Sequence, residues 1–336
     1  MVYLGVGRLV SNNVYAILLG ILANSIKYIG LVLSKKGACM VPEIETQTIW
    51  QNFKNFAKCK TWLIGFILTV VQWFPLMVAV RIGSLSVVAP TIVIGFIVLI
   101  IFSWFYLKEP IRVIEIISML IVIAAIITLY VVAPVEPIEF DLITQFNQFF
   151  KKTKAIAFIC SFAAIIIILI LITNRKQFPQ AGALLAIASG LSYATAIIFA
   201  KAAVGTLNFN SGTEFVANSL GRWEWYIYLV LMCIFYAIAF PIQQKSFQKG
   251  KAIVVTPTVD VMNIFTQVIA GIVIFNEWAD IWGGLELWKK ALKVLSIILI
   301  VISVALLSFL TAKDEMIVTP ETMKDEEEIK VENQSL

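Results

Sequence analysis

The chain consists of long apolar runs separated by short polar connections. Residues 92–107 and 297–310, with their flanks, form runs that carry almost no charge, and each is about the 20 residues that a helix needs to cross a hydrocarbon core of about 30 Å. Strands of a membrane barrel would alternate apolar and polar side chains, and these runs do not. The pattern therefore predicts an all-α integral membrane protein.

Apolar runs of spanning length recur along most of the sequence. We expect about nine transmembrane helices, near residues 14–33, 61–80, 84–107, 111–133, 155–173, 180–204, 225–243, 251–275 and 291–310. Residues 311–336 differ, because they are rich in acidic side chains and contain no aromatic one. Such a segment cannot bury enough apolar surface to fold, so we expect a disordered, solvated tail.

Composition narrows the chemistry. Hydrophobic residues make up 60% of the 336 residues and charged residues 14%, against about 45–50% and about 25% in a soluble domain. The chain has no histidine, and its four cysteines have no CxxC spacing, so nothing indicates imidazole catalysis, a zinc site or a disulfide framework. Nucleotide-binding glycine motifs are also missing. We expect neither an enzyme nor a cofactor.

The net charge of +5 does not indicate nucleic-acid binding, because the basic residues flank apolar runs, where they meet lipid head groups. The expected partners are membrane lipids and a small solute, and a homodimer is left open. Lysine and arginine are more frequent in the connections on one side of the nine spans. This bias places the N-terminus outside and the C-terminal tail in the cytoplasm, with the cell membrane as the expected location.

The sequence contains an internal repeat. Four pairs of matching positions keep one order and a spacing of 166 to 168 residues: Lys35 with Lys201, Pro75 with Pro241, residues 83–90 with 250–257, and Glu109 with Glu277. The repeating unit is four spans, and one further span lies between the two copies. Equivalent helices are therefore five spans apart, and because five is odd, the second copy must run upside down relative to the first.

This order defines the expected domains. Residues 14–133 form the first repeat, 134–179 a linker with the connecting helix, 180–310 the second repeat and 311–336 the acidic tail. Inverted repeats are the architecture of secondary carriers, whose substrate site lies near the membrane midplane between the copies. We therefore expect transport by alternating access, with a duplicated helical scaffold as the structural alternative.

Two ionisable residues, Lys27 and Asp260, lie deep inside predicted spans, where each charge costs about 2.5–3.5 kcal/mol on insertion scales. Asp260 follows Pro257 by three residues, and a proline frees carbonyl groups in the preceding turn. Asn263 and Gln267 share the helix face of Asp260. These oxygens suit a hard cation or a proton, and Asp260 is the expected metal ligand. The alternative is a buried acid that only pairs with Lys27.

Three polar residues of the first repeat could either belong to the same site or have only a structural role. Lys27 has Asn24 one turn earlier, and Gln72 lies in the middle of the second predicted span. These side chains could line the cavity that Asp260 enters from the second repeat. If Lys27 meets Asp260, the pair is neutral, and it could be broken and remade as substrate or a proton binds.

Other marked residues have structural interpretations. Four prolines lie in or at the mouth of a span, where kinks for gating and kinks for packing are equally open: Pro75, Pro90, Pro241 and Pro257. Four charged residues near span ends are expected to reach head groups or water: Lys35, Lys201, Glu109 and Glu277. A stripe of small residues should let another helix approach closely: Gly182, Ala186, Gly190 and Ala194.

Several short motifs mark the span ends. They are LSKKG at 33–37, VVAP at 87–90, LKEP at 107–110, AK at 200–201, IVVTP at 253–257 and IFNEW at 274–278. This set, spread over about residues 14–312, resembles the NIPA family of magnesium transporters, which belongs to the EamA-like drug/metabolite transporter superfamily. The resemblance implies a nine-span layout, a cytoplasmic C-terminus and Mg²⁺ as the transported ion.

The chain departs from this resemblance at its two deepest charges. Asp260 stands where the family usually carries a tyrosine, and Lys27 stands where the family is usually apolar or small. The expected function is transport of Mg²⁺ or another divalent cation. The alternatives are a small-metabolite exporter of the superfamily, in which Lys27 faces an anionic group, and a non-transporting membrane scaffold or receptor.

Overall fold

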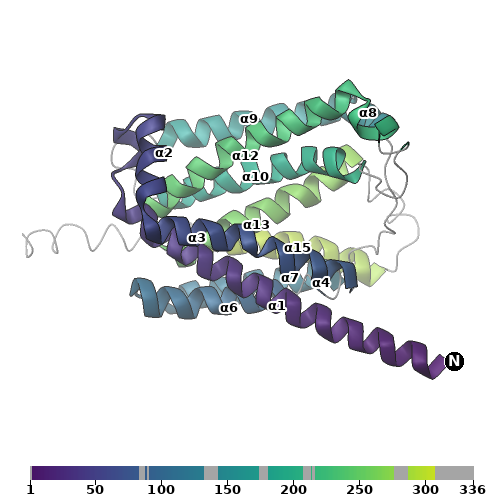
Figure 1. Ribbon diagram of the computed structural model, residues 1–336, viewed down its shortest axis with the longest axis horizontal. Coiled ribbons are helices and arrows are strands. Elements are labelled where there is room, and N and C mark those ends of the chain that lie inside the picture. The colour runs from purple at the N-terminus through teal and green to yellow at the C-terminus, as the bar shows by residue number, and fades with distance from the viewer. Residues whose placement is uncertain are drawn as a thin grey trace, which may run out of the picture.

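A computed structural model describes residues 2–82, 88, 91–131, 143–173, 181–206, 213, 216–275 and 287–306, and the regular structure in these residues is helical (Figure 1). The α-helices are α1 (Val2–Met40), α2 (Ile49–Lys58), α3 (Lys60–Val71), α4 (Trp73–Ile82), α6 (Ile92–Phe102), α7 (Val113–Val131), α8 (Ile143–Phe150), α9 (Thr153–Thr173), α10 (Ala181–Gly205), α12 (Trp223–Lys249), α13 (Ala252–Ala270) and α15 (Leu287–Ala305). A short 3-10 helix is η1 (Ile44–Thr46), and three π-helical turns are η3 (Ser103–Leu107), η4 (Val216–Leu220) and η5 (Gly271–Phe275).

Most of these helices suit a bilayer. Six stretches are long and apolar enough to cross a membrane: Val14–Met40, Lys60–Ala79, Thr153–Thr173, Ala181–Ala203, Trp223–Lys249 and Ala252–Ala270. Shorter apolar helices cover Ile94–Leu107 and Val113–Thr128. Large apolar side chains such as Ile167, Ile168 and Leu171 point outward from α9, as lipid-facing residues do. The expected all-α membrane protein with several spans is confirmed.

The helix boundaries differ from the expected spans. The first helix extends beyond 14–33 at both ends, and the expected span 61–80 consists of α3 and α4, which meet at Gln72. The ring of Pro75 clashes with the carbonyl of the residue four positions earlier, which explains a break just there. Several predicted features lie outside the described residues: Pro90, Glu277, most of 83–90 and the tail 311–336.

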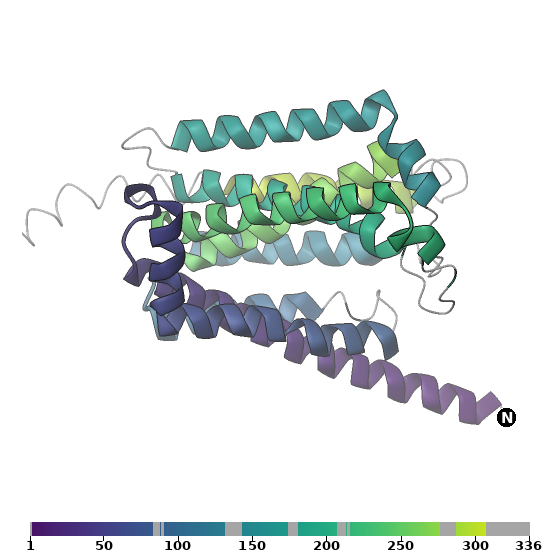
Figure 2. The ribbon, with the colours of Figure 1, turned by 45° about the horizontal axis from the view of Figure 1, so that its top comes forward.

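The helices pack in two similar groups. In the first, α1 lies against α3, α4 and α6, and in the second, α10 lies against α9, α12 and α13. The last helices of the two groups, α7 and α15, pack against each other. Figures 1 and 2 both show α2 crossing the end of the bundle opposite the N-terminus of α1.

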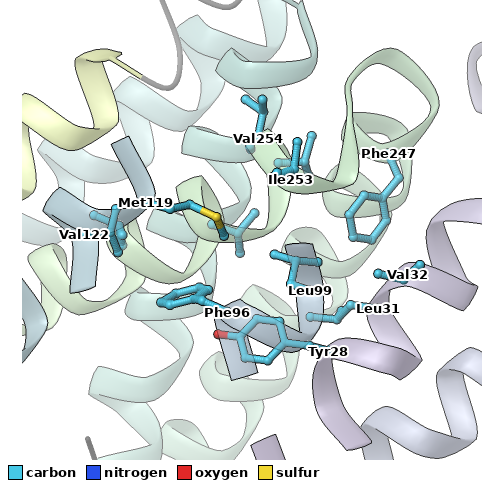
Figure 3. Packing of buried hydrophobic residues seen from close by; sticks show 14 of the residues in the cluster. Tyr28, Leu31, Val32, Phe96, Leu99, Met119, Val122, Phe247, Ile253 and Val254 are labelled. Carbon is cyan, nitrogen blue, oxygen red and sulfur yellow. The ribbon is translucent and has the colours of Figure 1, made fainter. Parts of the chain in front are cut away.

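The largest buried cluster joins both groups. It contains Tyr28 and Val32 of α1, Phe96 and Leu99 of α6, Met119 and Val122 of α7, Phe247 of α12, and Ile253 and Val254 of α13 (Figure 3). Because these helices lie far apart in sequence, the cluster brings the middle of α1 within reach of α13.

Close helix contact in the first group depends on small residues. A Cβ atom added at Gly65 of α3 would lie 2.5 Å from the backbone nitrogen of Ser34 and 2.6 Å from the carbonyl oxygen of Gly30. Both are backbone atoms of α1 and cannot rotate away. Small residues at such crossings let helices approach inside a membrane, where lipid offers no hydrophobic driving force.

We therefore expect Gly65→Ala to lower the free energy of unfolding by about 1–3 kcal/mol, as overpacking does. The measurement is the melting temperature of the detergent-purified protein, which should fall by several degrees. Ala164→Ser, which adds one atom at an exposed position on α9, is the control and should change little. Equal melting temperatures for Gly65→Ala and wild type would mean that α1 and α3 are not this close.

Candidate functional site

The two charges predicted deep in the membrane meet each other. The Lys27 Nζ atom on α1 donates to Asp260 Oδ1 at 2.9 Å and to Oδ2 at 3.1 Å on α13. The two side chains are 24% and 14% exposed. Pairing with good hydrogen-bond geometry offsets the cost of removing each charge from water. The sequence left open whether these residues pair, and the structure brings them together.

Tyr28 supplies a third hydrogen bond to the same carboxylate. Its hydroxyl donates to Asp260 Oδ2 at 2.8 Å, and its buried ring lies 5.2 Å from that of Phe96 (Figure 3). Gly95 leaves room for this ring, since a Cβ there would lie 2.4 Å from Tyr28 Cδ2. Helix α6 therefore holds the tyrosine against Asp260. Sequence reasoning missed Tyr28, whose only signal was its place beside Lys27.

The turn that carries Asp260 is held tightly by α10. A Cβ at Gly190 would lie 2.7 Å from both the Met262 Cβ and the Val259 carbonyl oxygen. At the start of α10, a Cβ at Gly182 would lie 2.6 Å from the carbonyl oxygen of Lys249. The close approach predicted from the small-residue stripe is confirmed at these two glycines. Helix α10 therefore packs directly against the turn that carries Asp260.

Two hydroxyl groups beside Pro257 have no hydrogen-bond partner among the described residues. Thr256 and Thr258 are both buried, and each Oγ1 atom is unpaired. An unsatisfied buried polar atom costs about 1–3 kcal/mol. Thr256 precedes Asp260 by four residues and so lies on its face of α13. This face therefore offers a free hydroxyl oxygen one turn from the carboxylate.

The predicted amides of α13 contact each other. Gln267 Nε2 donates to Asn263 Oδ1 at 3.0 Å, so these two side chains share a face as expected. Among the described residues, neither forms a hydrogen bond with Asp260, whose donors are Lys27 and Tyr28. The α13 face is therefore a polar stripe with the carboxylate at one position.

The predicted amides of the first group have other contacts. Asn24 Nδ2 donates to Thr91 Oγ1 at 3.0 Å, which ties α1 to the residue before α6. Gln72 is buried at the break between α3 and α4. Within the described part of the chain, neither forms a hydrogen bond with Lys27 or Asp260. Pro241 and Pro257 lie inside α12 and α13.

Lys35 does not reach lipid head groups, and that expectation was wrong. The residue is 9% exposed, and its ammonium group donates to the carbonyl oxygens of Phe247 and, at 2.5 Å, Gly250. Carbonyl groups in the last turn of a helix lack intrahelical donors, and the negative end of the helix dipole favours a cation. Lys35 therefore fastens the end of α1 to the end of α12.

Glu109 is not a solvated helix end either, so that expectation was also wrong. Its two carboxylate oxygens accept the N–H of Ala252, the first residue of α13, at 3.1 and 3.0 Å. Lys251 Nζ donates to Glu115 Oε1 at 3.0 Å and to the Pro110 carbonyl oxygen at 3.2 Å. The connection between η3 and α7 and the start of α7 thus also hold the turn between α12 and α13.

Two glutamates at this end have opposite pKa shifts. Burial raises the pKa of Glu109 above its ordinary value of 4.5, although the charge of Lys35 opposes the shift. Burial also acts to raise the pKa of Glu45, but hydrogen bonds and charges from Lys245 and Lys249 outweigh it and lower that pKa. Lys245 and Lys249 lie 2.5 and 2.7 Å from Glu45 Oε1.

Apolar spanning helices with a charge pair buried between two of them define a polytopic α-helical membrane protein. The profile of the family described as "Magnesium transporter NIPA" matches residues 11–314. The chain therefore belongs to the NIPA family, which is a family of membrane transporters, and the resemblance seen in its motifs is confirmed.

A named relative agrees with this assignment. The chain is 29% identical over 257 residues to "Probable magnesium transporter NIPA9" of Arabidopsis thaliana, and the match covers 74% of this chain and 70% of the relative. No solved structure gives a significant match.

The shift at Glu109 predicts a pH effect. A raised pKa means that folding favours the protonated acid, so its stabilising effect is present below pH 4.5 and is lost as the pH rises through the folded-state pKa. We compare the melting temperatures of wild type and Glu109→Gln. The difference, wild type minus variant, should increase as the pH falls from about 8 to about 5.

Glu45→Gln is the matched control at the same end. Its lowered pKa gives stability that is present above pH 4.5 and is lost only below it, so the wild-type minus variant difference should stay constant from about pH 8 to about 5 and shrink on further acidification. If the two differences changed in the same direction, the assignment of burial at Glu109 would be wrong.

Proposed function

We propose that this protein carries Mg²⁺ or another divalent cation across the cell membrane by alternating access, with Asp260 as the ion or coupling-proton site. The observation that carries the proposal is the set of bonds around Asp260. This carboxylate lies in the middle of α13, and both of its donors, Lys27 and Tyr28, come from the middle of α1. A charge pair between distant spans usually marks a pathway.

Two inverted repeats of four helices each, joined by α9, are the proposed architecture. The packing supports it, because α1 with α3, α4 and α6 corresponds to α10 with α12 and α13. In the proposed division, 14–133 and 180–310 are the repeats, 134–179 is the linker and 311–336 is the cytoplasmic tail. A carrier of this kind places its substrate between the copies near the midplane.

The π-helical turns give independent support. The turn η3 (Ser103–Leu107) follows α6, and η5 (Gly271–Phe275) follows α13. Their first residues are 168 positions apart, the same spacing that relates Glu109 to Glu277. π-turns are rare, and they often lie at functional sites. Their recurrence at one place in each copy is difficult to attribute to chance.

Helix direction supports the inversion. Lys35, near the end of α1, bonds to the Gly250 carbonyl oxygen. Gly182, near the start of α10, packs against the backbone of the same residue. The end of α1 and the start of α10 therefore lie at the same end of the bundle, so these proposed equivalents run in opposite directions, as Figure 1 also shows.

The charge pair suggests how a cation would be exchanged. Lys27 occupies both oxygens of Asp260, so an incoming ion must displace the ammonium group to reach the carboxylate. Mg²⁺ keeps several waters and uses one or two carboxylates, which suits a single acid beside the Thr256 hydroxyl and the Asn263 amide. When the ion leaves, Lys27 returns and keeps Asp260 paired.

In this scheme, the contacts at the α2 end keep the two repeats together and so close that end of the bundle. Lys35 of the first repeat and Glu109 of the same repeat both hold the turn at Gly250 of the second. Breaking and remaking these bonds would let the two repeats separate at that end. By the lysine and arginine bias, we propose that this end faces the cytoplasm and that the N-terminus is outside.

A small-metabolite exporter is the second candidate. The observation that favours it is Lys27 itself, because an ammonium group in mid-membrane could bind an anionic group of the substrate. A third possibility, a non-transporting scaffold or receptor, predicts no flux at all.

The first experiment is Mg²⁺ uptake into liposomes that contain the purified protein. We expect saturable flux in wild type and a loss of roughly ten- to hundredfold in Asp260→Asn, because a contact to a charged group is worth about 1.5–3 kcal/mol. Glu43→Gln, which neutralises an exposed acid, is the control and should transport normally. No wild-type flux above that of empty liposomes would remove Mg²⁺ as the substrate.

Lys27→Met tests the exchange step. We expect folded protein with a lower apparent KM for Mg²⁺, because the ammonium group no longer competes for the Asp260 oxygens. Lys151→Met, at an exposed lysine, is the control. Unchanged Mg²⁺ kinetics in Lys27→Met would contradict the exchange mechanism. Flux of an anionic metabolite that depends on Lys27, without Mg²⁺ flux, would favour the exporter.

A further inference from the structure

Helix α2 presents an uncovered apolar face. Ile49, Trp50 and Phe53 are 91%, 74% and 67% exposed, and their spacing places them on one side of the helix. The helix is well formed, because a capping box joins Thr48 and Gln51 at its start. It crosses the end of the bundle (Figures 1 and 2), so this face does not lie along the spans.

The side of α2 next to this exposed face is fastened to the protein. The Phe56 ring lies 5.1 Å from that of Trp62, and Trp62 Nε1 donates to Gln244 Oε1 at 2.9 Å. Asn52 Nδ2 donates to the Ile44 carbonyl oxygen at 2.9 Å. With these contacts in place, α2 cannot rotate its apolar face onto the bundle.

Basic residues border the apolar face. Lys54, Lys58 and Lys60 are exposed, and residues 47–60 contain no acid. An amphipathic helix with lysines beside large apolar side chains lies in the membrane interface, and clusters of lysine next to spans attract anionic lipid. Charge and shape therefore select one kind of occupant, an anionic phospholipid layer.

The other end of the bundle gives a contrast. Helix α8 is followed by Lys151, Lys152 and Lys154, which are also exposed. The apolar residues Ile143 and Phe146 of α8 are buried in the protein. The lysine clusters beside α2 and α8 are similar, but of these two helices it is α2 that has an uncovered apolar face in the described residues.

We propose that α2 and the first residue of α3 form a docking site for anionic phospholipid, with Ile49, Trp50 and Phe53 inserted at the acyl boundary and Lys54, Lys58 and Lys60 at the phosphates. In the orientation given above, this is the cytoplasmic leaflet. The proposal does not depend on which solute is transported.

The test compares lipid preference in bilayers. The full chain is reconstituted in phosphatidylcholine, and electron spin resonance measures the association of spin-labelled phosphatidylglycerol relative to spin-labelled phosphatidylcholine. We expect wild type to prefer phosphatidylglycerol and the variant Lys54→Gln/Lys58→Gln/Lys60→Gln to lose this preference several-fold. The control Lys151→Gln/Lys152→Gln/Lys154→Gln should retain most of it.

A second variant separates docking from simple attraction. Trp50→Gln/Phe53→Gln keeps every lysine but removes the apolar anchor, and we expect it to lower the preference as well. Equal losses in the two lysine variants, or no loss in Trp50→Gln/Phe53→Gln, would overturn the proposal in favour of unspecific surface charge. If wild type were a dimer and Trp50→Gln/Phe53→Gln a monomer, α2 would be a contact between two copies of the chain. That result would also overturn the lipid proposal.

Discussion

The need to pair every charge inside a bilayer determines how the two halves of this protein meet. Lys27 and Asp260 lie in the middle of their helices and bond to each other. Removing either partner of such a pair leaves a buried charge, at a cost of about 3–5 kcal/mol. The pair therefore requires α1 to lie beside α13, and the contact places Tyr28 on the same carboxylate. The two charges predicted deepest in the membrane form one structural unit.

Much of the fold could be predicted from local patterns. Apolar runs of spanning length predict membrane helices because backbone groups in lipid must be satisfied within the segment, and small residues every four positions predicted the close contact at Gly190. Spacing also predicted that Asn263 and Gln267 share a face. The helix ends were less predictable, as the break at Gln72 shows.

The contacts at the α2 end could not be predicted, because they depend on distant backbone groups. Lys35 looked like a lysine that reaches lipid head groups, yet its acceptors are carbonyl oxygens more than 200 residues away. Glu109 caps a helix that starts 143 residues later. Backbone carbonyl and N–H groups are common to nearly all residues, so the sequence does not indicate which of them will bind a given side chain. Only the three-dimensional fold reveals these partners.

The Lys27–Asp260 pair also has a consequence for the membrane voltage. Moving one elementary charge through 100 mV changes the free energy by about 2.3 kcal/mol. Because the lysine and the aspartate cancel, the proposed carrier would move no net charge through the field at this site when it returns without cargo. Its return step would be insensitive to the electrical potential, which would act instead on the step that carries the ion.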